Sequence, residues 1–209
     1  MIGRIIVDDA CVREGAAWLA TQDSRMADAL VLVGPLPLRR KPDGFAELFS
    51  AIIGQQVSVA SARAIWGRLT DAGMTVAASV AATSQDDLRA LGLSQQKARY
   101  AHALAHADID FDALRDAPSD TVIKTLTAVT GIGAWTAEVY AMFSLGRADV
   151  FAPGDLALQE GAKLLFDLPE RPKEKALRTM AQDWSPWRSV AARLLWAYYA
   201  HMKTREGIR

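Results

Sequence analysis

The apolar positions of this chain recur with helical spacing along most of its length. Stripes of this kind predict helices over residues 45–53, 58–69, 135–145, 156–166, 173–182 and 187–202. Ser84 and Ser94 each stand before a further helix, where a serine hydroxyl serves as N-cap. Strand-like alternation is confined to RIIV near the start and ALVLVG at 29–34. The pattern predicts an all-α fold of about ten short helices.

The connections between the predicted helices are short and carry glycine, proline or polar residues. The longest of them, GPLPLRRKPDG at 34–44, has the most linker-like composition. We therefore expect a boundary between two lobes near residue 43.

Composition narrows the classes of protein to be considered. The 209 residues carry 24 basic and 24 acidic side chains, so the net charge is zero. This balance argues against a polybasic binder but leaves open a local basic face on a neutral protein. The single cysteine, Cys11, excludes an internal disulfide framework and a four-cysteine iron–sulfur cluster built from this chain. Neither terminus carries a signal-like or membrane-spanning apolar run, so a cytoplasmic protein without membrane contact is expected.

The stretch LTAVTGIGAWTAEVY predicts two helices joined by a glycine hairpin. Gly131 and Gly133 flank Ile132, which would plug the two helices together. Amides at the start of the second helix lack partners within that helix and suit a phosphate. A tight helix–helix turn with Gly131 as C-cap is the other interpretation. Thr136 continues a Gly-Ile-Gly-x-x-Thr-Ala pattern that is typical of helix-hairpin-helix DNA binding.

One carboxylate, Asp155, follows the hairpin in the loop VFAPGDLALQ. Pro153 and Gly154 predict a turn, after which Asp155 would cap the next helix. The positive end of a helix dipole favours the charged form of such an acid. A fixed negative charge stabilises the oxocarbenium-like sugar that forms when a base leaves its nucleotide.

Together these motifs resemble the helix-hairpin-helix–Gly/Pro–Asp superfamily of DNA glycosylases, most closely DNA-3-methyladenine glycosylase II. AIIGQQVSVASARAI, LGLSQQKARYAHALA and WSPWRSVAARLLWAYY extend the resemblance over roughly residues 44 to 201. It implies two helical lobes with a cleft between them: residues 44–147, and residues 1–43 plus 148–209. It also implies that Asp155 is catalytic, and that a monovalent cation, sodium or potassium, lies at the backbone carbonyls of Thr127, Val129 and Gly131.

Two departures from that superfamily point to a monofunctional enzyme that uses water. Members with lyase activity carry a lysine where this chain has Trp135, which cannot form a Schiff base. The cysteines of the iron–sulfur subgroup are absent, so no cluster and no required cofactor is expected. Gln56 aligns with the residue that fills the gap left by a flipped base, where some relatives have leucine. A plain polar loop residue is the alternative for Gln56.

The tryptophans bear on the choice of lesion. Trp135 and Trp187 match positions that line the base pocket in the resembled family, although core packing is the other interpretation of each. An indole face attracts the cationic ring of an alkylated purine. Trp18, Trp66 and Trp196 are expected in the core. Arg188 could reach a phosphate or pair with an acid inside the fold.

The sequence thus favours a monomeric, monofunctional glycosylase that flips and excises alkylated purines, of the 3-methyladenine type, from double-stranded DNA. Asp155 would act on the sugar, Trp135 and Trp187 on the base, and Gln56, Gly131, Gly133 and Thr136 on the DNA. The alternatives are the same fold acting on uracil or mismatched bases, and a non-catalytic helix-hairpin-helix module.

Overall fold

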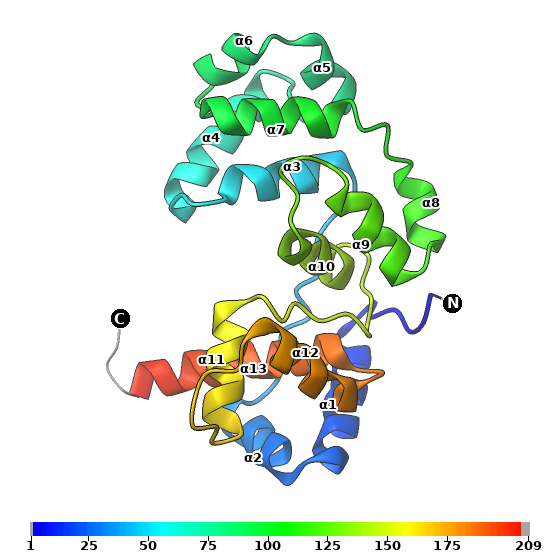
Figure 1. The fold of residues 1–209 in the computed structure, drawn as a ribbon, viewed down its shortest axis with the longest axis vertical. Helices are drawn as coiled ribbons and strands as arrows, with labels where there is room; N and C mark the ends of the chain where they lie inside the picture. Colours follow the sequence, from blue (N-terminus) through cyan, green and yellow to red (C-terminus); the bar gives the residue numbers. More distant parts are fainter. Residues whose placement is uncertain (1, 206–209) are drawn as a thin grey trace. The chain divides into compact units, whose positions relative to one another are not determined.

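The computed structural model describes residues 2–205, whose secondary structure is helical, with no sheet among these residues (Figure 1). The chain divides into two compact units. Unit 1 holds residues 1–40 and 141–209, and unit 2 holds residues 41–140. The sequence had placed these boundaries after residues 43 and 147. The predicted cleft between lobes stays a prediction, and each unit is described by itself.

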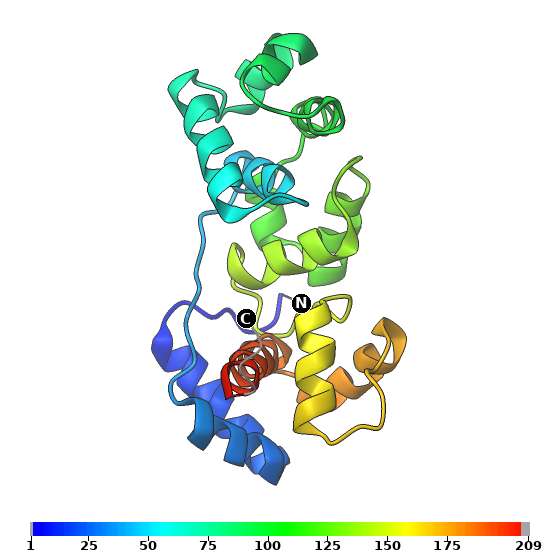
Figure 2. The ribbon, with the colours of Figure 1, turned by 90° about the vertical axis from the view of Figure 1, so that its left-hand side faces the viewer.

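Unit 1 is built around its last helix. It contains α1 (Asp9–Gln22), α2 (Ser24–Val33), α11 (Leu156–Leu165), α12 (Glu174–Met180), the short 3-10 helix η1 (Ala181–Trp184) and α13 (Arg188–Arg205). Helix α13 packs against α11, α2 and α1, and Figure 2 looks nearly along its axis. Its residues from Val190 to Leu195 are fully buried, so α13 forms the centre of the apolar core.

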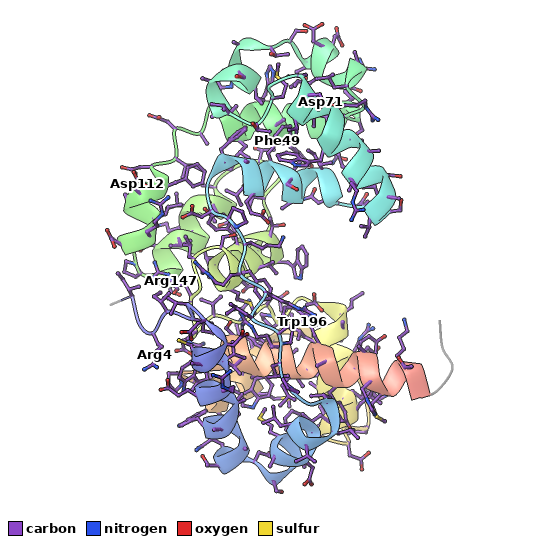
Figure 3. The ribbon with its side chains drawn as sticks, turned by 180° about the vertical axis from the view of Figure 1, so that it is seen from behind. Arg4, Phe49, Asp71, Asp112, Arg147 and Trp196 are labelled. Carbon is purple, nitrogen blue, oxygen red and sulfur yellow. The ribbon has the colours of Figure 1, made fainter. Side chains whose placement is uncertain are left out.

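Unit 2 contains the remaining helices. They are α3 (Phe45–Gly54), α4 (Val59–Asp71), α5 (Ala77–Ala82), α6 (Gln85–Ala90), α7 (Gln95–Ala105), α8 (Phe111–Asp116), α9 (Ser119–Thr127) and most of α10 (Ala134–Phe143). Helix α7 packs against α3, α5 and α6. Phe49 on α3 is fully buried and meets Trp66 edge-on, with ring centroids 5.9 Å apart (Figure 3).

Polar N-caps set the start of many helices, as the sequence predicted for two of them. The hydroxyl oxygens of Ser84 and Ser94 accept hydrogen bonds from the amides of Asp87 and Lys97. These bonds satisfy amides that a helix leaves without a partner in its first turn. The prediction of both caps is confirmed.

The N-terminal segment differs from its strand-like pattern. Residues 29–33 belong to α2, and α1 precedes it; both begin at an aspartate N-cap, Asp8 or Asp23. Within the described residues, the RIIV segment contributes only one isolated bridge, between Ile5 and Arg147. Alternation over so few residues does not distinguish a strand from a helix that is buried on one face. No helix among the described residues is long and apolar enough to cross a bilayer.

A glycine sets the distance between α11 and α13. A Cβ atom built on Gly161 would lie 2.6 Å from the carbonyl oxygen of Leu195, which is closer than real Cβ atoms come to backbone. Only glycine therefore lets these two helices approach as they do.

We expect Gly161→Ala to lower the free energy of unfolding by about 1–3 kcal/mol, because the added methyl group must push two packed helices apart. Thermal unfolding followed by circular dichroism measures the change. Gly67→Ala is the matched control, since Gly67 lies on exposed α4 with open space around it. The control should gain about 0.5–1 kcal/mol. Equal effects of the two substitutions would contradict the packing argument.

Candidate active site

Asp155 caps helix α11, as the sequence predicted. Its backbone is extended, with φ −73° and ψ 121°, and its Oδ1 accepts a hydrogen bond from the amide of Leu158 at 3.0 Å. The indole Nε1 of Trp196 donates a second bond to the same oxygen at 3.1 Å. The side chain is half-buried. Two donors from different helices therefore fix the position of this carboxylate.

Hydrogen bonds within unit 1 fix the loop before Asp155. The amide of Asp155 donates to the carbonyl of Ala152 at 3.0 Å, which closes the turn. The side-chain amide of Gln159, itself buried, donates to the carbonyl of Pro153 at 2.8 Å. The Gly/Pro segment is thus anchored through its carbonyl groups, and Gly154 lies exposed beside the acid.

Trp196 is the site residue that the sequence analysis assigned to the core. Its ring is partly exposed and lies 5.7 Å from the ring of Phe143, with 32° between the planes (Figure 3). The one signal in the sequence was general: a tryptophan on a buried helix needs an acceptor for its N–H. Which acceptor it meets depends on how α11 packs on α13, and periodicity does not show that.

Trp187 has the packing role that the sequence left open as an alternative. It is 5% exposed, and its ring fills the space beside Gly15 on α1, where a Cβ would lie 2.6 Å from the ring. Trp187 therefore has a packing role within unit 1, and its predicted contact with a base stays a prediction.

Arg188 pairs with an acid inside the fold, which was one of its two predicted roles. Its Nε and Nη2 donate to the two oxygens of Asp149 at 2.6 and 2.9 Å. Burial opposes the charge of Asp149, but the bonds from Arg188 and Ser185 outweigh it and lower the pKa of this carboxyl. The pair orders the loops before α11 and α13.

The predicted hairpin is present in unit 2, between α9 and α10. Gly131 has φ +99°, and a Cβ there would overlap the ring of Tyr100, so glycine is required for two reasons. Ile132 is 4% exposed and plugs the turn, as expected. Gly133 is exposed, with open space around it, and its carbonyl accepts the amide of Ala137 at the start of α10. An anion could therefore approach the first turn of this helix closely.

The two residues after the hairpin differ in exposure. Trp135 is 47% exposed, which is unusual for so large an apolar ring. Thr136 is 6% exposed. Thr136 is therefore buried, and its predicted contact with a phosphate stays a prediction.

The loop that carries Gln56 is tied to the hairpin by its neighbour. Gln55 donates its side-chain amide to the carbonyl of Gly131 at 3.1 Å. Lys97 donates to the carbonyl of Ile53 at 2.6 Å, where a cation suits the end of α3, and burial lowers the pKa of this lysine. Gln56 itself is exposed, with φ +55°. A long side chain in this strained region, at the tip of a fixed loop, suits insertion into a DNA stack.

Two of the three carbonyl groups predicted to bind a cation already accept a hydrogen bond. Gly131 accepts from Gln55, and Val129 accepts from the amide of Ile132 at 3.0 Å. Each carbonyl oxygen has a second lone pair, and hard oxygens are the ligands that sodium and potassium take. The donor set of Thr127, Val129 and Gly131 fits such an ion, which stays a prediction.

Comparison with known proteins agrees with this geometry. A structure titled DNA-3-methyladenine glycosidase from Bacillus halodurans is 37% identical, with a TM-score of 0.80, over 90% of this chain and 88% of that one. The Schizosaccharomyces pombe 3-methyladenine DNA glycosylase Mag1, solved with abasic DNA, is 26% identical, with a TM-score of 0.77, over 92% and 97%. DNA-3-methyladenine glycosylase 2 of Escherichia coli is 29% identical over 168 residues, which are 74% of this chain and 57% of that protein.

The share of a relative that this chain spans varies widely. It is 42% for a Bacillus subtilis relative and 94% for a second Schizosaccharomyces pombe relative. A family model described as HhH-GPD superfamily base excision DNA repair protein matches residues 49–186. This range contains the hairpin, the Gly/Pro loop and Asp155. The chain therefore belongs to the HhH-GPD superfamily of base excision DNA repair proteins.

Proposed function

We propose that this protein is a monofunctional DNA glycosylase that hydrolyses the N-glycosidic bond of alkylated purines, of the 3-methyladenine type, in double-stranded DNA. The observation that carries this proposal is the double hydrogen bond that fixes Asp155 at the start of α11. The names of the similar glycosylases support the choice of alkylated bases.

The chemistry follows from one fixed negative charge. Breaking the bond between base and sugar leaves positive charge on the sugar, which a carboxylate stabilises when it is already in place. A purine alkylated at N3 or N7 is cationic and leaves with little acid assistance, so a second carboxylic acid is not needed. Asp155 would also orient the water that attacks the sugar. Because Trp135 stands in place of a catalytic lysine, we propose that no lyase step follows.

Unit 2 would bind the DNA around the lesion. The base must leave the stack before the acid can reach its sugar. The amides at Gly131 and Gly133 would bind a phosphate, with added positive charge from a cation if one is held there. Gln56 would fill the gap in the stack, and the exposed ring of Trp135 would contact the extruded base. We place this activity in the cytoplasm with the DNA, in a monomer without a required cofactor.

Asp155→Asn tests the role of the acid. Asparagine is as good an N-cap as aspartate and still accepts from Leu158 and Trp196, so the fold should persist. Loss of the charge should lower base release by about a hundredfold or more. Mass spectrometry of bases freed from methylated genomic DNA measures release, and fluorescence anisotropy with an abasic-analogue duplex should show unchanged binding.

The same assay on the parent protein separates the rival functions. Release of uracil in place of methylated purines would favour the other enzyme. Binding without release of any base would favour a non-catalytic module and overturn the proposal.

Trp196→Phe tests the second bond to Asp155. Phenylalanine keeps an aromatic ring beside Phe143 but removes the N–H donor. A loosened carboxylate should lower the single-turnover rate about tenfold, the equivalent of one neutral hydrogen bond. Trp184→Phe is the matched control, because Trp184 is a buried ring stacked on Phe166. The control should lower thermal stability and leave the rate alone; a rate loss shared by both variants would point to packing.

Gln56→Ala tests the gap-filling role. Without a side chain to occupy the vacated space, excision of a paired lesion should slow about tenfold, since flipping itself costs a few kcal/mol. Gln56→Leu should keep most of the rate because leucine also fills a gap. Gln85→Ala, at an exposed glutamine that opens α6, should have no effect. Rates measured under single-turnover conditions decide the matter, and an unchanged rate for Gln56→Ala would remove Gln56 from the site.

A further inference from the structure

Arg39 and Arg40 lie at the end of the segment that leads out of the N-terminal part of unit 1, and both are exposed. Within residues 2–205, neither arginine makes a hydrogen bond or ion pair. Other arginines of this unit do face carboxylates: Arg4, Arg25, Arg171, Arg178 and Arg188. In a protein without net charge, two uncompensated cations side by side form a local positive site.

The backbone holds Arg39 in a conformation that it would not adopt freely. Its φ is +53°, in the left-handed region where a long side chain is uncommon. The buried guanidinium of Arg193 donates to the carbonyls of Pro37 and Leu38 just before it, with the shortest bond at 2.8 Å. Burial and the charges of Arg39 and Arg40 lower the pKa of Arg193 to about 10. The strain at Arg39 is thus maintained by an anchor built into the core.

The guanidinium of Arg39 lies over the ring of Trp196, with Cζ 5.7 Å from the ring centroid. Trp196 in turn donates to Asp155. One aromatic side chain therefore separates an exposed cation from the candidate catalytic acid. Arg40, the next residue, lies against Gly146, where an added Cβ would overlap its guanidinium.

A cation at this place does not help the sugar chemistry directly, because it would oppose a positive transition state. Stacking on an indole does, however, restrain a guanidinium while its N–H groups remain available at the edge of the plane. Those groups match the oxygens of a phosphate in a bidentate fashion. A nucleotide whose sugar reaches Asp155 carries a phosphate on each side of that sugar.

We propose that Arg39, with Arg40 beside it, binds a phosphodiester that flanks the extruded nucleotide. This phosphate site belongs to unit 1 and is distinct from the hairpin of unit 2. It rests on the proposed function, since the nucleotide at Asp155 brings the phosphate with it. Arg193 and Trp196 act as positioning residues that hold Arg39 for this contact.

The experiment measures binding to a duplex with an abasic-site analogue by fluorescence anisotropy, over a series of salt concentrations. Arg39→Gly removes the charge and suits the left-handed backbone, so the melting temperature should not fall. We expect about tenfold weaker binding and a salt slope lower by about 0.9, the value for one lost phosphate contact. Arg39→Lys should recover the salt slope but only part of the affinity, because lysine lacks the planar fork.

Duplexes with a neutral methylphosphonate on either side of the abasic analogue identify the phosphate. One of these two modified duplexes should bind the parent protein more weakly. The same modification should hardly change the affinity of Arg39→Gly, because the substitution and the methylphosphonate remove the same contact. Arg13→Ala, at an exposed arginine on α1, is the matched control and should leave affinity and slope unchanged.

The outcomes separate this site from the proposed function. Unchanged affinity and salt slope in Arg39→Gly would overturn the phosphate site even if the parent releases methylated purines. The phosphate site would also be overturned if Arg39→Gly bound DNA normally but released bases with an altered pH profile. Arg39 would then act on Asp155 through Trp196. A third outcome would overturn the proposed function and still support the phosphate site. In that case the parent protein releases no base, but its DNA binding is weakened by Arg39→Gly and by one methylphosphonate, and the two changes combined weaken it no further than either alone.

Discussion

The position of the Asp155 carboxylate depends on the contact between α11 and α13. Asp155 begins α11, and its second donor, Trp196, comes from α13. The two helices come close enough for this bond because Gly161 has no side chain to meet the backbone of Leu195, the residue before Trp196. A helix–helix distance set by one missing methyl group thereby determines where the charge lies. The chemistry proposed here requires that charge to be in place before the sugar becomes positive, so it depends on this helix packing.

Helix α13 also positions the residues around Asp155, through the buried guanidinium of Arg193. Arg193 is 1% exposed, a position that costs free energy unless the charge is well satisfied. Its donors are taken up by the carbonyls of Pro37, Leu38 and Ser189, and its plane lies over Phe143. These bonds connect α13 to the segment that carries Arg39. A core arginine of this kind contributes less to stability than to holding two surface elements in a defined arrangement, here the indole and the exposed arginine above it.

The sequence was informative wherever the structure is decided locally. The N-cap at Asp155, the buried Ile132 and the glycine at 131 follow from neighbours along the chain, and all three are observed. Where packing between distant segments decides the surroundings of a residue, the sequence did not predict them. Trp187 and Trp196 look alike in a helical pattern, yet Gly15 of α1 buries the first and Asp155 of α11 engages the second. Thr136 follows a DNA-binding pattern, and the pattern did not show that this residue is buried. Helix α2 was missed because it ends in a short continuous apolar run, ALVLV, which is compatible with a buried strand as well as with a helix.

The absence of net charge constrains how such a protein can hold DNA. A uniformly basic surface would bind any duplex through released counterions, with little preference for a damaged nucleotide. Here many arginines of unit 1 are paired with carboxylates, so long-range attraction is weak and the remaining donors act only at short distance. In the binding mode proposed above, those donors would be the backbone amides of the glycine hairpin in unit 2 and the guanidinium of Arg39 beside Trp196 in unit 1. We therefore infer that recognition of damage begins with how easily a nucleotide leaves the base stack. The charge of Asp155 then acts only on a nucleotide that has been extruded.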